Sequence, residues 1–131
     1  LLKENGIAVI HYIGANTEPK AENDFIQRYI FPNGRCPSFS EVMPAIEKSG
    51  LILSDVDVWR KHYYYTLIEW HKNFMEKKEE ITKLMGEKFT MIYRIYLWGC
   101  AQAFLNDLQI MQLTLTKKID TVPITKNYLF N

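Results

Sequence analysis

The sequence has few of the residues that build metal sites and no stretch long and apolar enough for a membrane span. Only two of its 131 residues are cysteines, Cys36 and Cys100, and no Cys-x-x-Cys pair or Cys/His cluster occurs, so a zinc site is not expected. No apolar run approaches the ~20 residues of a membrane-spanning helix. The first residues also lack the pattern of a secretory leader. The net charge of +1 argues against a general binder of nucleic acid.

What remains is the composition of an ordinary globular domain. Hydrophobic residues make up 47% of the chain and charged residues 24%, which is typical of soluble folds. The spacing of Cys36 and Cys100 leaves a disulfide open, and a reduced chain is the simpler interpretation. Residues 1–5 with Gly6 are typical of the last turn of a helix. Because a domain rarely starts at the end of a helix, we expect the sequence to be the C-terminal portion of a longer protein.

The hydrophobic pattern predicts strands and helices in alternation. Residues 7–13 form a continuous apolar run, typical of a central strand buried on both faces of a parallel sheet. Further strands are predicted at residues 51–59 and 108–116, and the single greasier face of the latter suits a sheet edge. Helices are predicted at residues 24–30, 38–48, 63–85 and 87–106. This order indicates the second half of an α/β sheet, with upstream strands missing and a long helical insertion before the last strand.

The densest local signal lies in residues 29–38. Pro32 fixes its own φ and suits the second position of a tight turn, while Asn33 and the glycine after it tolerate positive φ. Ser38 and Glu41 have the spacing of a capping box, which predicts the start of a helix. A rigid loop before a helix is a frequent place for function.

Four motifs occur in one order along nearly the whole chain. They are His-Tyr-Ile-Gly at 11–14, Tyr-Ile-Phe-Pro-Asn-Gly with Pro-Ser within 29–38, His-Tyr-x-x-Thr-Leu-x-x-Trp at 62–70, and Tyr-Leu-x-Gly-Cys-Ala-x-x-Phe at 96–104. Together they resemble the motifs of cyclopropane-fatty-acyl-phospholipid synthases, which are class I S-adenosylmethionine-dependent methyltransferases. Two positions depart from that pattern: Asn33 replaces a commoner glycine, and Tyr12 replaces a common threonine.

The resemblance implies a Rossmann-like α/β fold, with residues 1–131 as the C-terminal part of the catalytic domain. The half that binds S-adenosylmethionine would lie upstream, so no cofactor-binding residue is assigned here. The implied enzyme transfers a methyl group from S-adenosylmethionine to the double bond of an unsaturated phospholipid acyl chain. The resulting carbocation then loses a proton to bound bicarbonate and closes to a cyclopropane. We expect the fragment alone to be inactive.

The resemblance also implies three site residues. The His, Ile and Tyr that hold bicarbonate in this family correspond to His11, Ile13 and Tyr63, whereas the family's Cys and Glu fall upstream. Without the resemblance, His11 would be interpreted as a structural residue and Tyr63 as a packed aromatic. The chemistry is suitable, because N–H and O–H donors can hold a small anion and open α/β sheets bind ligands at the carboxyl ends of their strands.

The resemblance further implies phospholipid acyl chains as partners, with transient contact with the inner face of the cytoplasmic membrane. The aromatic stripe is core at first interpretation, although part of it could line an acyl-chain pocket; it comprises Trp70, Phe74, Tyr93, Trp98 and Phe104. Surface cations such as Arg35, Arg60 and Lys61 are either scattered or meet anionic headgroups.

Two other kinds of function stay open. A related enzyme would methylate fatty acids without ring closure, or amines of small molecules. A non-catalytic module would serve dimerisation or lipid binding. A homodimer is compatible with each of these functions.

Overall fold

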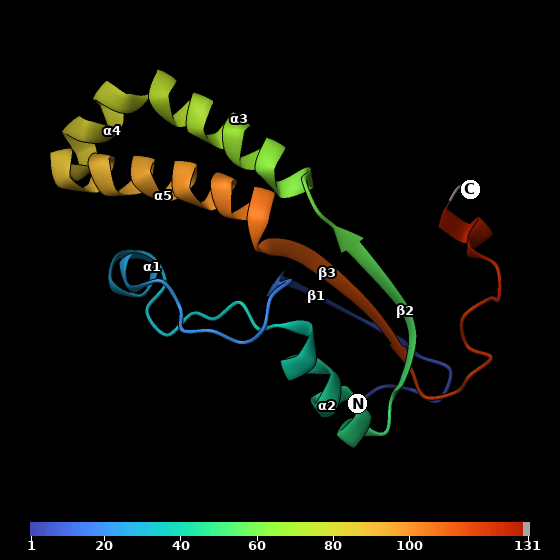
Figure 1. Ribbon diagram of the computed structural model, residues 1–131. Helices are drawn as coiled ribbons and strands as arrows, with labels where there is room; N and C mark the ends of the chain where they lie inside the picture. The colour runs from blue at the N-terminus through green and yellow to red at the C-terminus, as the bar shows by residue number, and fades with distance from the viewer. Residues whose placement is uncertain (130–131) are drawn as a thin grey trace.

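A computed structural model describes residues 1–129 of the chain. The elements follow in the order β1 (Ile7–Ala15), α1 (Asp24–Tyr29), α2 (Phe39–Ser49), β2 (Ile52–Trp59), α3 (His62–Glu76), α4 (Lys78–Met85), α5 (Glu87–Asn106), β3 (Leu108–Thr116) and a 3-10 turn, η1 (Lys126–Leu129). Figure 1 shows a twisted sheet with a long helical hairpin projecting from one end. The helical insertion before the last strand is therefore confirmed. Phe130 and Asn131 lie outside the described residues.

The last strand along the chain is the central strand of the sheet. The strand order is β1-β3-β2, and β3 runs antiparallel to both neighbours. The expectation that residues 108–116 form an edge strand is therefore wrong. Both faces of β3 are covered, because Ile110 packs into a helical cluster while Leu113 and Leu115 pack against α2. Alternation within one strand does not reveal its position in the sheet.

β1 differs from its prediction in the opposite sense. Within residues 1–129 its strand partner is β3, which is antiparallel, and Ile7 and Val9 are 50% and 60% exposed. The expectation of a central parallel strand buried on both faces is therefore wrong for this part of the chain. The apolar run remains a real signal of burial, but the described residues cover only part of it.

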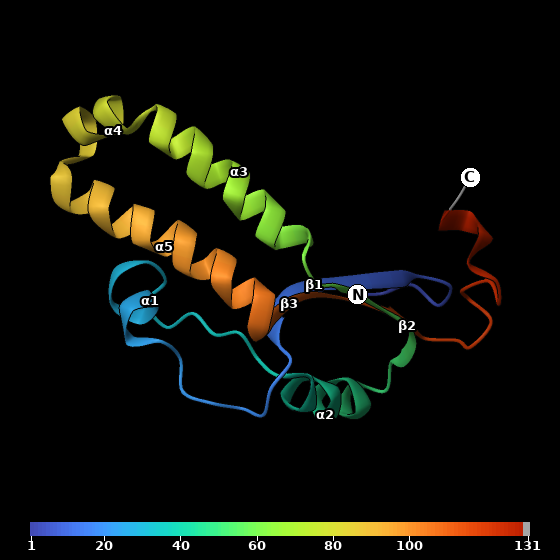
Figure 2. The same cartoon turned by 45° about the horizontal axis from the view of Figure 1, so that its top comes forward.

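Two apolar clusters hold the fold together. One joins α2 to a face of the sheet around Ile46, Leu113 and Leu115. The other joins α3, α5 and the end of the sheet around Leu67, Leu97 and other buried residues. Figure 2 shows this division, with α2 beneath the sheet and the hairpin rising from its end. The carboxyl end of β1 thus lies where the sheet meets the helices.

The predicted helix at 63–85 is two helices. α3 ends at Glu76 and α4 begins at Lys78; between them, Lys77 has a φ of −102° and a ψ of 10°, which depart from helical values. The change of direction brings α4 back onto α5, where the Thr82 and Thr90 hydroxyls lie 3.1 Å apart. No glycine or proline marks this break, so it could not be predicted from local residues.

Both ends of α2 follow the prediction. The Glu41 carboxylate accepts a hydrogen bond from the Ser38 N–H at 2.9 Å, and Gly50 ends the helix with a left-handed φ of 71°. Pro44 lies inside the helix, which begins at Phe39, directly after the cap.

The opening residues do not form the predicted helix end. Residues 1–6 contain a turn in which the Gly6 N–H donates to the Lys3 carbonyl at 3.0 Å. Among residues 1–129, no helix is long and apolar enough to cross a bilayer.

Candidate functional site

The loop before α2 forms the tight turn that its sequence predicts. The Gly34 N–H donates to the Phe31 carbonyl at 3.0 Å, and Asn33 has a φ of 63°. Pro32 in the second position and a positive φ in the third fit a type II turn. An added Cβ at Gly34 would lie 2.9 Å from Phe31 Cβ, so glycine is required there by space.

The exit of this loop is fixed against the end of β1. The Ala15 N–H donates to the Pro37 carbonyl at 3.1 Å, and Ser38 forms a parallel bridge with Ala15. The Cys36 N–H donates to the Glu22 carboxylate at 2.8 Å. The second family-like motif therefore meets the first in space, at the carboxyl end of β1.

His11 lies on the sheet face in a row that crosses all three strands. It pairs in register with Gln112, which pairs with Asp57. The Gln112 amide nitrogen lies 3.0 Å from His11 Nδ1. Because an amide nitrogen only donates, Nδ1 accepts and Nε2 carries the proton. His11 is thus held as a tautomer whose Nε2 can donate to a ligand.

An aromatic contact also orients His11. The Trp59 ring stands edge-on to the imidazole, with centroids 5.9 Å apart, and the Trp59 indole N–H donates to the Asp57 carboxylate at 3.1 Å. On its other side, Trp59 lies 5.7 Å from the His62 ring at the start of α3. Trp59 therefore links His11 to the helix that carries Tyr63.

Ile13 and Tyr63 pack against the same buried cluster where the sheet meets the helices. The Tyr63 ring lies 5.0 Å from Phe104 and 6.0 Å from Trp70. The structure thus brings Ile13 and Tyr63 to one cluster and connects His11 to it through Trp59. Among the described residues, no hydrogen bond or ring contact joins His11 directly to Tyr63.

The supporting residues of His11 were missed by the sequence interpretation. Gln112 lies 101 positions from His11, and its role depends on strand register, which the motifs do not reveal. Trp59 lies at the end of a predicted strand, close to the start of a predicted helix. That position was the one sequence feature that could have indicated its contact with the site.

Burial keeps the groups near Tyr63 protonated. It raises the pKa of Tyr96 to about 12, with smaller contributions from Cys100, Tyr93 and Tyr63. Burial likewise raises the pKa of Cys100 to about 11, with Cys36 adding to the shift. A protonated Cys100 is a poor nucleophile, and both cysteines are free thiols. This part of the molecule offers O–H donors in an apolar setting.

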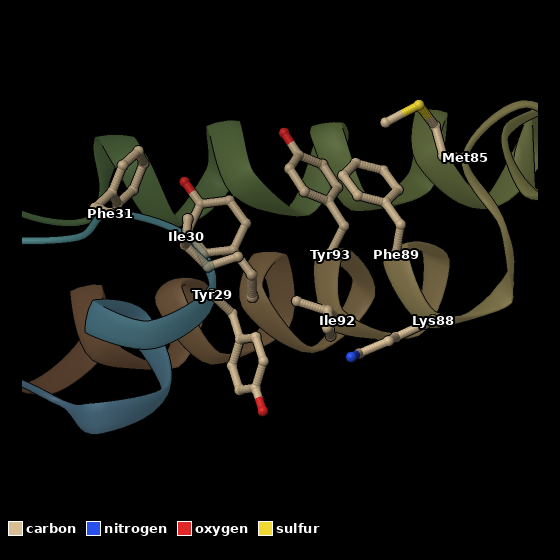
Figure 3. A pocket seen from close by; sticks show the side chains of 9 residues that line it. Tyr29, Ile30, Phe31, Met85, Lys88, Phe89, Ile92 and Tyr93 are labelled. Atoms are coloured by element: carbon tan, nitrogen blue, oxygen red, sulfur yellow. The ribbon is translucent and has the colours of Figure 1, made fainter.

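A pocket of about 520 Å³ opens between the turn and α5. Figure 3 shows Phe31 on the turn facing the aromatic side of α5, with Lys88 beside Ile92. The lining residues are Tyr29, Ile30, Phe31, Met85, Lys88, Phe89, Ile92, Tyr93 and Tyr96. Phe89 and Tyr93 stack at 5.5 Å with an interplanar angle of 14°. The lining of the pocket is mainly aromatic and aliphatic, which suits an apolar ligand.

The predicted aromatic stripe divides among three environments. Phe74 and Phe104 are buried core residues, whereas Tyr93 lines the pocket. Trp70 and Trp98 are 44% and 51% exposed. Trp98 borders a second, wider groove of about 1260 Å³ along α3, α4 and α5. Within residues 1–129, no cluster of three metal-ligating side chains occurs.

A comparison with family models matches residues 1–113 to the mycolic acid cyclopropane synthetase family. The chain belongs to this family. Its members are S-adenosylmethionine-dependent methyltransferases that include the cyclopropane fatty acid synthases. The resemblance inferred from the four motifs is thereby confirmed.

Curated relatives agree with this assignment. A probable fatty acid methyltransferase of Pseudomonas putida is 36% identical over 104 residues, covering 79% of this chain and 26% of the relative. The cyclopropane-fatty-acyl-phospholipid synthase of Escherichia coli K12 is 30% identical over 120 residues, covering 91% of this chain and 31% of that enzyme. The chain therefore spans about a quarter to a third of these relatives.

Solved structures place the fold in the same family. The cyclopropane synthase MmaA2 from Mycobacterium tuberculosis superposes with a TM-score of 0.80 at 28% identity, over 87% of this chain and 45% of that protein. The mycolic acid cyclopropane synthase CmaA1 complexed with SAH and CTAB gives 0.76 at 27% identity, over 84% and 44%. The three-stranded antiparallel sheet with its helices thus matches part of a cyclopropane synthase.

Proposed function

We propose that this chain is the C-terminal portion of a cyclopropane-fatty-acyl-phospholipid synthase. The observation that carries the proposal is spatial. The loop from the second motif is fixed at the end of β1, beside the first motif, and presents Phe31 to the aromatic wall of α5. Motifs that are distant in sequence therefore converge on one donor-bearing strand end and one apolar pocket.

In this proposal, residues 1–131 are part of the catalytic domain, and the S-adenosylmethionine site lies in the upstream part. When bound, S-adenosylmethionine would supply the methyl group, and bicarbonate would serve as the base for the proton that is lost at ring closure. The residues that would hold bicarbonate are His11, the backbone at Ile13, and Tyr63. Their chemistry fits a small anion, because the Gln112 contact leaves His11 Nε2 as a donor and Tyr63 carries an O–H.

The pocket between the turn and α5 would take part of the substrate acyl chain. Its lining is mainly aromatic and aliphatic, and Lys88 is the lysine that lines it. Apolar walls exclude water, which protects a carbocation from capture. The enzyme would collect its phospholipid substrate at the inner face of the cytoplasmic membrane.

Analysis of lipid products tests this function in the complete protein. Expressed in a bacterium without its own cyclopropane synthase, the protein is expected to convert unsaturated phospholipid acyl chains to cyclopropane chains, identified by mass spectrometry. His11→Ala and Tyr63→Phe should each lower the turnover by about a hundredfold or more. His71→Ala and Tyr65→Phe, both on α3 and outside the proposed site, serve as matched controls.

The second candidate is a fatty acid methyltransferase that does not close a ring. It is favoured by the 36% identity to the probable fatty acid methyltransferase of Pseudomonas putida. The same product analysis separates the two, because a methyl-branched acyl chain without a cyclopropane would contradict ring closure. Unmodified acyl chains would contradict both candidates.

A further inference from the structure

We propose that Gln27 is a positioning residue for the acyl-chain pocket, because its side-chain amide holds the turn that presents Phe31 to α5. The inference rests on the proposed function for the identity of the ligand. The clamp itself rests on hydrogen bonds and ring contacts in the structure.

Both ends of the Gln27 amide are bound to the backbone of the turn. The amide nitrogen donates to the Gly34 carbonyl at 2.5 Å, and the amide oxygen accepts from the Asn33 N–H at 3.0 Å. Few side chains can replace this pair of contacts. A glutamate has no N–H for the Gly34 carbonyl, and an asparagine is one methylene shorter.

The backbone of this turn determines where the Phe31 side chain lies. The Phe31 and Tyr96 rings meet nearly at right angles, with centroids 5.8 Å apart, and both line the pocket. Phe31 is 53% exposed, so burial in a core does not fix its position. Its place in the pocket wall therefore depends on the backbone of the turn.

The surrounding segment has little other support. α1 contains no buried residue, and the loop is joined to the sheet by the hydrogen bond and bridge between Ala15 and residues 37–38. The Glu22 carboxylate, which accepts from the Cys36 N–H, belongs to the same segment, just before α1. Segments with few buried contacts open at low free-energy cost. Loss of the Gln27 clamp should thus loosen the pocket wall without unfolding the two apolar clusters.

Steady-state kinetics of the complete protein on vesicles of dioleoylphosphatidylglycerol test the clamp. Gln27→Ala and Gln27→Glu are each expected to raise KM for the phospholipid about tenfold, a fold-change that corresponds to ~1.4 kcal/mol. KM for S-adenosylmethionine and the thermal unfolding midpoint should stay near their original values. Gln102→Ala, which removes a half-buried glutamine of α5, is the matched control.

The outcomes separate the clamp from the function on which it rests. Suppose that the original protein modifies the phospholipid and that Phe31→Ala raises KM, but that Gln27→Ala leaves KM unchanged. This result would overturn the role of Gln27 and would leave the acyl-chain pocket supported. A fall in the unfolding midpoint with an equal change in both KM values would show a merely structural role and also overturn it. An original protein that modifies no acyl chain overturns the proposed function, and with it the ligand named here.

Discussion

Two glycines of the family-like motifs, Gly34 and Gly99, occupy opposite environments. A Cβ on Gly34 would meet Phe31 Cβ at 2.9 Å and the Phe31 carbonyl oxygen at 3.2 Å, whereas a Cβ on Gly99 would meet nothing within 4 Å. Gly99 is an exposed position inside α5. One glycine is thus required by space, and the other costs the helix backbone entropy.

Substitution of each glycine by alanine should therefore change stability in opposite directions. Gly34→Ala is expected to lower the free energy of unfolding by about 1–3 kcal/mol, because the turn must open. Gly99→Ala should raise it by about 0.5–1 kcal/mol. Urea unfolding of both variants measures the difference, and effects of equal sign would contradict this account.

Tyr96 makes a second prediction at the scale of one residue. Its pKa is about 12 in the folded protein, against an ordinary value of 10.0, so the folded state holds the proton more tightly than the unfolded state. The stabilisation is fully present below pH 10 and is lost as the pH rises toward 12.

Thermal unfolding measured between about pH 9 and pH 12, a range that includes both pKa values, tests this loss of stability. The unfolding midpoint of Tyr96→Phe should fall less over this range than that of the original protein. Tyr65→Phe, which changes an exposed tyrosine, provides the comparison. An unchanged slope in Tyr96→Phe would show that the phenol does not contribute.

Local residues were the most predictable part of the site. The turn at 31–34 and the cap formed by Ser38 and Glu41 depend on neighbours within a few positions, and both are present. The contacts of His11 with Gln112 and Trp59 come from distant parts of the chain. They could not be predicted, because strand register and sheet order determine them.

At the scale of elements, α5 carries its core on one side only. Leu97 is 1% exposed within the cluster shared with α3, and Leu105 on the same helix is 41% exposed. The periodicity of the apolar residues predicted this helix. It did not predict which of them face α3, because that depends on the break at Lys77 and on how α4 packs back onto α5. Helix existence is a local property, whereas helix packing depends on the connections.

Truncation of these two leucines should separate core from surface. Leu97→Ala is expected to lower the free energy of unfolding by about 2–5 kcal/mol through the cavity that it leaves. Leu105→Ala should change it by less than about 1 kcal/mol. Chemical unfolding measured by circular dichroism tests the pair, and similar losses for both would place Leu105 in a covered interface.

At the scale of the whole molecule, the sheet was predicted as a class but not in its order. The alternation of strands and helices and the helical insertion before the last strand were predicted correctly. The central place of β3 was not predicted, because the glutamines and threonines that alternate with its apolar residues are typical of an edge strand, although both of its faces are covered. The apolar composition of a strand indicates how much of its surface is buried, whereas its position in the sheet depends on the strands with which it pairs.

The proposed division of the enzyme predicts how the isolated chain behaves. The 131-residue chain should not bind S-adenosylmethionine in calorimetric titration, because none of its residues is assigned to that ligand. The complete protein should bind it. Micromolar binding by the isolated chain would contradict the division, and the original protein under the same conditions is the positive control.

The position of β3 between two earlier strands also makes the pairing of this sheet long-range in sequence. His11 meets Gln112 across 101 positions, and contacts between such distant residues form slowly because the intervening chain must first be ordered. The hairpin of α3 and α5 is local and leads directly into β3, so its early formation would deliver β3 to both outer strands. Among the described residues, the strand partner of both β1 and β2 is β3, so during synthesis this part of the sheet cannot be completed until residue 116 has left the ribosome.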